Sequence, residues 1–245
     1  MEPLSRLIIF LFLLVFSEVA AHAQTYQHTA IWGRVAASYN VDKQWGLIGD
    51  LLYRRQSHPD RGLFRPFNSP LLSAGRVGVS YRTRHWQYSL FPVVLFYTYP
   101  ALGNSIDLNR SPVLEFRPSA YAEWTLSLRP KSALRLRAGY EYRNFLTPRL
   151  PDLGRIRFRA AWRRGFGPHT YGQLWNETLV FGPPNSPVSG QVFDLNRTNA
   201  SVGYALSNIS TLEAGYQFTH RQRRSIIEFD NEQALTLTLF LTFNP

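Results

Sequence analysis

Apolar and charged residues alternate along much of the chain. In the clearest segment, from Ala133 to Arg143, one face carries leucine, alanine and tyrosine, and the other carries mainly arginine and glutamate. The next segment, from Arg155 to Arg163, places four arginines opposite isoleucine, phenylalanine, alanine and tryptophan. A period of two with one apolar and one charged face predicts strands that separate two different environments.

The same alternation predicts an all-β chain, and no segment shows helical periodicity. One long uncharged stretch, residues 86–106, contains Pro92 and Pro100 together with many β-branched and aromatic residues, so it predicts strand and not a spanning helix. Eleven strands are predicted, at residues 28–40, 44–56, 71–83, 86–98, 113–128, 133–145, 154–166, 169–181, 193–206, 210–222 and 233–243.

The connections between these strands are alternately short and long. The short ones are residues 41–43, 83–84, 129–131, 166–168 and 207–209, and the long ones are 57–70, 99–112, 146–153, 182–192 and 223–232. Short turns at one end and long loops at the other are typical of an outer-membrane β-barrel. The predicted strands are also much longer than the roughly 5 to 6 residues usual in soluble proteins, and suit a tilted membrane crossing.

We therefore expect a single antiparallel up-and-down transmembrane β-barrel. Bacterial barrels of one chain have an even number of strands, so the count of eleven is adjusted to about twelve, with ten as the alternative. An apolar outer face and an Arg/Glu interior fit a bilayer, although alternation alone leaves open a soluble sandwich with a solvated charged face. Aromatic residues near strand ends are expected to form interfacial girdles: Trp32, Trp45, Tyr53, Tyr81, Trp86, Trp124, Tyr142, Trp162 and Tyr204.

The N-terminus predicts export. Arg6 precedes the apolar run Leu7 to Phe16, and Ala21-His22-Ala23 follows as a small-residue cleavage pattern. The run is shorter than the roughly 20 residues of a spanning helix. We expect a secretory signal peptide at residues 1–23 and a barrel at residues 24–245, located in the outer membrane of a Gram-negative cell.

Charge and cysteine content narrow the function classes. Lys and Arg number 27 against 16 Asp and Glu, a formal net charge of +11, and 15% of residues are aromatic. The absence of cysteine excludes disulfides, thiol catalysis and thiolate metal sites. No nucleic-acid-binding pattern accompanies the positive charge. Basic loops such as Arg221 to Arg224 instead suit the phosphates of lipopolysaccharide, so outer-membrane lipid and lipopolysaccharide are the expected partners.

Several short segments in a fixed order carry a family resemblance. They are residues 41–47 with Asp50 and Arg54, then Leu134-Arg135-Leu136-Arg137, Glu141-Tyr142-Arg143, Arg155-Ile156-Arg157-Phe158, Trp175-Asn176-Glu177, Asp194-Leu195-Asn196-Arg197 and Leu212-Glu213-Ala214-Gly215-Tyr216-Gln217. Together they resemble a family of outer-membrane β-barrels catalogued as domain of unknown function 2490. The resemblance implies a barrel location and offers no activity. Phe243 is the expected signal for the barrel-assembly machinery; it is followed by Asn244-Pro245, whereas barrel proteins commonly end in Phe.

Catalytic patterns do not emerge from the histidines. Outside the signal these are His28, His58, His85, His169 and His220, and no Gly-x-Ser-x-Gly or His-Glu-x-x-His pattern occurs. We expect no enzyme activity, no catalytic residue, no metal and no cofactor. Two alternatives remain open: a membrane-embedded lipid hydrolase that uses His58 or His220, and a soluble periplasmic β-barrel or lipocalin-like binding protein.

The expected functional feature is a charge network in the barrel interior. Its predicted members are Arg135, Arg137, Arg143, Arg157, Arg159, Glu115, Glu123, Glu141, Glu177 and Glu213. About twelve strands enclose an interior that such long side chains largely obstruct. The sequence thus predicts a narrow or gated porin-like pore or a structural barrel, and the excess of inward arginine favours small anionic solutes over cations.

Overall fold

The computed structural model describes residues 24–147 and 150–244; the predicted signal peptide lies outside these residues. The described part is all-β, as predicted, and contains two short 3-10 helices. The strands are β1 (Gln24–Asn40), β2 (Trp45–Gln56), β3 (Ser69–Arg82), β4 (Trp86–Thr98), β5 (Val113–Phe116), β6 (Ser119–Arg129), β7 (Ser132–Thr147), β8 (Leu153–Gly165), β9 (Thr170–Gly182), β10 (Phe193–Ala205), β11 (Ser210–Gln222) and β12 (Glu228–Phe243). The 3-10 helices are η1 (Pro59–Arg61) and η2 (Ser105–Asn109).

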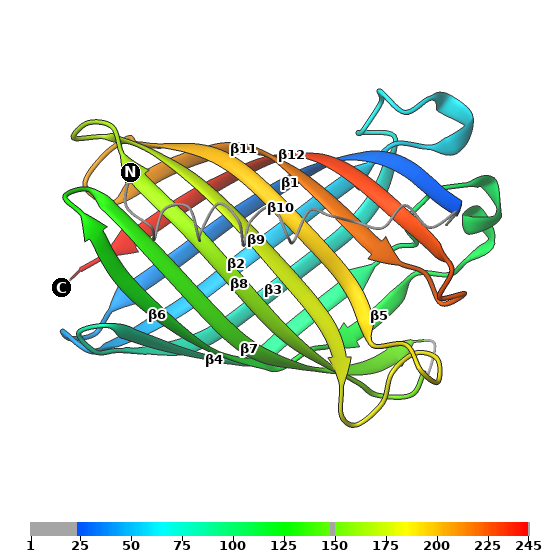
Figure 1. Ribbon diagram of the computed structural model, residues 1–245, viewed down its shortest axis with the longest axis horizontal. Coiled ribbons are helices and arrows are strands. Elements are labelled where there is room, and N and C mark those ends of the chain that lie inside the picture. Colours follow the sequence, from blue (N-terminus) through cyan, green and yellow to red (C-terminus); the bar gives the residue numbers. More distant parts are fainter. Residues whose placement is uncertain (1–23, 148–149, 245) are drawn as a thin grey trace, which may run out of the picture.

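The strands close into a barrel with eleven positions around its ring (Figure 1). Strands β5 and β6 both lie between β4 and β7, so they are two halves of one interrupted strand. The interruption falls at Arg117-Pro118, because proline lacks the backbone N–H that a continuous ladder requires. The eleven strands predicted from the alternation therefore match the eleven positions of the ring. The adjustment of that count to twelve or ten was wrong.

An odd ring changes how the barrel closes. Neighbouring strands are antiparallel everywhere except at the closure, where β1 and β12 run parallel from Gln24 beside Glu228 to Tyr39 beside Phe243. The expectation of a wholly antiparallel barrel was wrong at this seam. As a result, β1 begins at one end of the barrel and β12 finishes at the other, as Figure 1 shows by the blue start of β1 and the label C.

Short turns and long connections segregate to opposite ends of the barrel, as predicted. Tight turns link β1 to β2, β3 to β4, β6 to β7, β8 to β9 and β10 to β11. The first of these is held by Asp42, whose carboxylate accepts backbone hydrogen bonds from Gln44 at 2.7 Å and Trp45 at 2.6 Å. The hydrogen bond from Trp45, and to a smaller extent the one from Gln44, lowers the pKa of Asp42. The opposite end carries the longer connections, with η1 and η2 among them (Figure 1).

The barrel has an apolar outside and a largely charged inside. Leu51 and Leu235 point outward and are 67% and 61% exposed, whereas Glu115 and Glu177 point inward and are each 1% exposed. Part of the interior, beside β3 and β4, is filled by an apolar cluster that includes Leu72, Phe91, Val94 and Phe96. The ionic groups therefore concentrate on the remaining wall, mainly β7 to β10. Among the described residues, no helix is long and apolar enough to cross a membrane.

Outward aromatic side chains gather toward both ends of the strands. Trp45, Trp86, Trp162 and Tyr204 are exposed near the tight turns, and Tyr53, Tyr97 and Tyr140 are exposed nearer the long connections. Trp32 was expected to belong to this outer set, and that expectation was wrong. It lies on the inward face of β1, in phase with buried His28 and Ala30, because inward positions of this strand are the even-numbered ones.

Candidate functional site

The densest ionic cluster in the interior surrounds Glu177 of β9. Its carboxylate is bound by Arg137 of β7 at 3.1 Å, Arg157 of β8 at 2.8 Å and Arg197 of β10 at 2.6 Å. These strands are neighbours in the ring, so the alternation of each strand brings one charged side chain to the same depth. One buried carboxylate thus faces three guanidinium groups.

A second carboxylate extends this cluster toward the long connections. Arg157 also pairs with Glu141 of β7, which accepts a further contact from Arg155 at 2.5 Å. Arg155 in turn reaches Asp194 of β10 at 2.8 Å. The ion pairs of β7 to β10 therefore form one connected network, which we call the central network: Arg137, Arg155, Arg157, Arg197, Glu141, Glu177 and Asp194.

Tyr121 packs against Gly139 and contacts two residues of the central network. Tyr121 of β6 is directly opposite Gly139 of β7, and a Cβ at Gly139 would lie 2.2 Å from the tyrosine ring. The glycine therefore leaves the space in which the ring lies. From that position Tyr121 donates a hydrogen bond to Glu141 at 2.8 Å, and its ring is 5.4 Å from the guanidinium carbon of Arg157.

Two smaller clusters contain residues that were not predicted from the sequence. Asp50 of β2 binds Arg34 of β1 and Arg76 of β3, both at 2.6 Å. These three charges lie on three different strands, so only the cross-strand register reveals that they meet. Predicted Glu115 binds predicted Arg143 at 2.9 Å, and it also binds Arg117 at 2.7 Å.

The remaining predicted residues also lie on inward faces but are less tightly paired. Arg135 and Glu123 lie 3.7 Å apart, and Arg135 also donates to Gln173. Glu213 accepts a hydrogen bond from Tyr171 at 2.7 Å. Arg159 has no carboxylate within salt-bridge distance among the described residues. The ten predicted residues thus share the interior, but they fall into separate clusters, because the register and depth of each strand decide which charges meet.

Three inward arginines stack on aromatic rings instead of pairing with carboxylates. The guanidinium carbons lie 3.3 Å from the Trp32 ring centroid for Arg54, 3.9 Å from that of Trp175 for Arg159 and 3.4 Å from that of Tyr171 for Arg163. None of the three has a side-chain hydrogen bond within the described part of the chain. Stacking occupies the faces of the guanidinium and leaves its N–H edge available for another acceptor.

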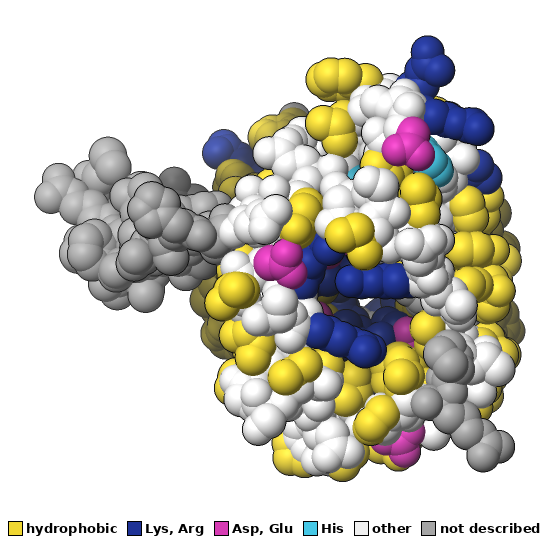
Figure 2. Space-filling model, turned by 90° about the vertical axis from the view of Figure 1, so that its right-hand side faces the viewer, with side chains coloured by type: hydrophobic (Ala, Val, Ile, Leu, Met, Phe, Trp, Pro, Cys, Tyr) yellow, Lys and Arg dark blue, Asp and Glu magenta, His cyan; other side chains and the backbone are white. Residues whose placement is uncertain are grey.

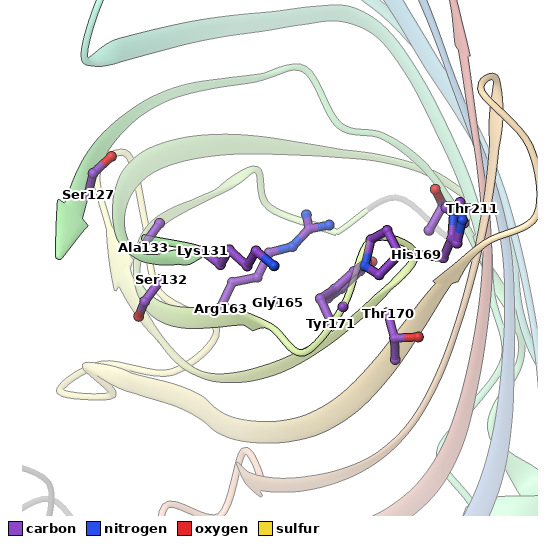
Figure 3. Close-up of a pocket in the computed structure, with 13 residues that line it drawn as sticks. Ser127, Lys131, Ser132, Ala133, Arg163, Gly165, His169, Thr170, Tyr171 and Thr211 are labelled. Atoms are coloured by element: carbon purple, nitrogen blue, oxygen red, sulfur yellow. The ribbon is translucent and has the colours of Figure 1, made fainter. Parts of the chain in front are cut away.

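A basic cavity of about 440 Å³ opens at the tight-turn end of the barrel (Figure 3). Its lining includes Lys131, Arg163, His169 and Tyr171. The rings and long side chains of these residues come from the β6–β7 and β8–β9 turns and the adjoining ends of β8 and β9. This cavity brings solvent close to Arg163, the arginine nearest to the tight-turn end of the inward face of β8.

The opposite mouth is partly covered by the loop between β4 and β5. The backbone N–H of Leu102 binds Gln56 at the end of β2, and Asp107 of η2 binds Arg223, which follows β11, at 2.8 Å. Strands β3, β2 and β1 separate β4 from β12 in the ring, so the loop spans a large part of this mouth. Figure 2 faces this end and shows Lys and Arg side chains, in dark blue, around the opening.

We call the contact of Arg223 with Asp107, which holds the β4–β5 loop over the mouth, the latch. Arg223 is bound by two acidic side chains. Besides Asp107, which is fully buried, Arg223 contacts Asp230 at 2.5 Å. Burial opposes the charge of Arg223, but hydrogen bonds from Arg223 to Asp230 and Asp107 outweigh it and raise the pKa of this guanidinium. The loop is thus held by an ionic contact between Asp107 and Arg223.

Three histidines of the described residues have side-chain or backbone partners, but none belongs to a group that could hold a metal. No group of three His, Cys, Asp or Glu side chains that could hold a metal is present in the described residues. His28 of β1 is buried and lies 3.1 Å from Glu232 of β12. His58 accepts a backbone hydrogen bond from Asp60, and His220 lies 2.7 Å from the side-chain oxygen of Asn231.

A protein-family model matches residues 29–230, and it is described as protein of unknown function (DUF2490). The chain belongs to this family. The match confirms the resemblance seen in the sequence segments, and the DUF2490 region contains the whole central network, the three stacked arginines and the latch. No curated protein matches the chain. The DUF2490 description assigns no activity, so the function must be inferred from the barrel itself.

Proposed function

We propose that the protein is an outer-membrane β-barrel that admits small anions along a narrow interior path and catalyses no reaction. The observation that carries this proposal is the inverted distribution of polarity. Leu51 and Leu235 on the outer wall are more than half exposed, while the glutamates of the central network are almost completely buried. A bilayer is the solvent in which both arrangements are stable.

The outer wall supports a lipid environment over a membrane-sized height. On β12, Leu235, Leu237, Leu239, Leu241 and Phe243 alternate with inward residues over the roughly 9 to 11 residues that a tilted strand needs to cross. Soluble monomers rarely expose contiguous apolar patches larger than a few hundred Å². The aromatic side chains gathered toward both ends of the strands correspond to the interfacial girdles of membrane barrels.

The interior supports selectivity for anions. The central network joins three carboxylates to four arginines, and three further arginines are stacked on aromatic rings without a carboxylate partner. Rings of arginine and lysine side chains favour anions in pores, because they replace part of the hydration of the anion and repel cations.

Two features make the proposed path narrow. Ion-paired side chains extend inward from β7 to β10, and an apolar cluster fills the interior beside β3 and β4. The latched β4–β5 loop covers part of the mouth at the long-connection end. We therefore expect a small conductance that depends strongly on whether the β4–β5 loop is held in place.

The geometry of the histidines supports the absence of catalysis. The lipid-hydrolase alternative depends on His58 or His220. His58 accepts a hydrogen bond from the backbone of Asp60 and lies 3.8 Å from its carboxylate, which is 64% exposed, and His220 contacts the side-chain oxygen of Asn231. A hydrolytic site needs a histidine within hydrogen-bond reach of a nucleophile or an activated water, with a third group that orients it.

Cell fractionation tests the location. We expect the folded protein in the outer-membrane fraction, where it shifts its migration in a gel after boiling, as heat-modifiable barrels do. Recovery of folded protein in the soluble periplasm would contradict the proposal and support the soluble binding protein. Phospholipid hydrolysis by the purified barrel that is lost on changing His58 or His220 would support the hydrolase.

A further inference from the structure

Arg159 is an inward cation at the middle of β8 that forms no ion pair with the described residues. Its guanidinium lies against the ring of Trp175, 3.9 Å from the centroid. Its Nε is buried and lacks a hydrogen-bond partner, and no carboxylate within residues 24–147 and 150–244 is close enough for an ion pair. By contrast, Arg157, two residues earlier on the same face, is paired with both Glu141 and Glu177.

The neighbours of Arg159 increase the local positive charge. Arg137 of β7 is directly opposite Arg159 in the β7–β8 register, and like charges directly opposite each other destabilise a sheet. Glu177 is opposite Arg159 on the other side, but it already binds Arg137, Arg157 and Arg197. The central network has one more arginine than carboxylates, and Arg159 adds a second uncompensated charge.

Uncompensated cations of this kind need an anion. Removing an ion from water is unfavourable, and a counter-ion with good hydrogen bonds offsets that cost. The indole of Trp175 fixes the plane of the Arg159 guanidinium and leaves its N–H edge free, and a planar N–H fork suits an oxyanion with two acceptor oxygens.

We propose that Arg159 and Arg137 together bind one small oxyanion, of the phosphate or carboxylate class, inside the barrel. Arg137 uses one terminal nitrogen for Glu177, at 3.1 Å, and has further N–H donors for the anion. The basic cavity at the tight-turn end supplies the approach, since Arg163 lines it and lies on the same face of β8 as Arg159. The site deepens the proposed function, on which it rests for the access of anions to the interior.

Isothermal titration of the detergent-solubilised, folded barrel tests the site with inorganic phosphate and, separately, with acetate. We expect one anion to bind per barrel, and expect Arg159→Gln to weaken binding about tenfold or more, as loss of a charge-assisted bidentate contact does. The matched control is Arg164→Gln. It removes the same charge from the same strand, but from the outer face of β8, so it should leave binding unchanged. Arg159→Lys keeps the charge and removes the fork, so it should weaken binding several-fold in a barrel that folds even if the glutamine variant does not.

Each result decides the proposal. Binding of phosphate or acetate that depends on Arg159 supports the site. The anion that binds more tightly shows whether the site prefers the phosphate or the carboxylate class. No binding of phosphate or acetate to the native barrel would overturn it, as would equal weakening by Arg159→Gln and Arg164→Gln, or native affinity in Arg159→Lys. The titration does not require conduction, so a barrel that conducts anions but fails to bind them refutes this site alone. A barrel that binds but does not conduct refutes the proposed pore.

Discussion

Tyr39 of β1 and Phe243 of β12 lie side by side on strands that run in the same direction. This parallel seam follows from the eleven-position ring, because the first and last strands of an odd ring must point the same way. It places the start of β1 with the long connections and the end of β12 with the tight turns.

The parallel seam predicts the sidedness of the two strand ends. The chain has no cysteine, so single substitutions to cysteine at Gln24, Ser189, Asn208 and Asn244 give unique labelling sites. A membrane-impermeant maleimide should label Gln24→Cys together with Ser189→Cys from one side, and Asn208→Cys together with Asn244→Cys from the other. Labelling of Gln24→Cys and Asn244→Cys from the same side would indicate an even ring and contradict the seam.

If the apolar outer wall faces lipid, as we propose, it predicts an unusual response to a surface charge. Leu51 is 67% exposed in the middle of β2, where a soluble protein would tolerate arginine. In a bilayer, Leu51→Arg should lower the free energy of unfolding by about 2 to 4 kcal/mol. Urea unfolding in lipid vesicles measures this, with Asn208→Arg in an exposed turn as the control that should change it by less than about 0.5 kcal/mol. Equal stability of the two variants would argue for a soluble barrel.

Close packing of Tyr171 on Gly203 predicts sensitivity to a single methyl group. A Cβ at Gly203 would lie 2.1 Å from the Tyr171 ring, so Gly203→Ala must displace the ring from Glu213 and from the Arg163 guanidinium. We expect a loss of about 1 to 3 kcal/mol in unfolding free energy. Gly167→Ala is the control, because nothing lies within 4 Å of its added Cβ. A Gly203→Ala barrel as stable as the control would show that the tyrosine does not need this space.

The latch predicts that two arginines on the same aspartate differ in importance. Arg223 is buried against Asp107 and Asp230, whereas Arg110, 3.2 Å from Asp107, has a side chain that is 60% exposed. Arg223→Gln removes the ion-pair partner of Asp230 and leaves Asp107 with only the exposed Arg110, so it should release the loop. An exposed pair such as Arg110–Asp107 contributes about 1 kcal/mol or less. Proteolysis within residues 99–112 of the folded barrel should become at least about tenfold faster for Arg223→Gln than for Arg110→Gln. Equal rates would show that the latch does not hold the loop.

Strand positions were predictable from sequence because alternation directly reflects which face is buried. Ala133 to Arg143 and Arg155 to Arg163 were identified on this basis, and they supply much of the interior charge. The ring count was also readable, and it went wrong only through the rule that bacterial barrels are even. The break at Arg117-Pro118 does not add a position, because both halves lie between the same two neighbours.

The pairing of interior charges was not predictable, since it depends on register between strands. Asp50 meets Arg34 and Arg76 only because β1, β2 and β3 align at these positions. Trp32 was assigned to the outer wall from its residue type, whereas its phase with His28 and Ala30 places it inside against Arg54. The β4–β5 latch joins residues of two loops, Asp107 and Arg223, which no local pattern connects.

The reversal potential of the purified barrel in a planar lipid bilayer tests the central claim most directly. With a potassium chloride gradient across the membrane, the excess of inward arginine predicts a small conductance whose reversal potential lies toward the equilibrium potential of chloride. A reversal potential toward that of potassium, or a folded and inserted barrel that never conducts, would contradict an anion path through the interior.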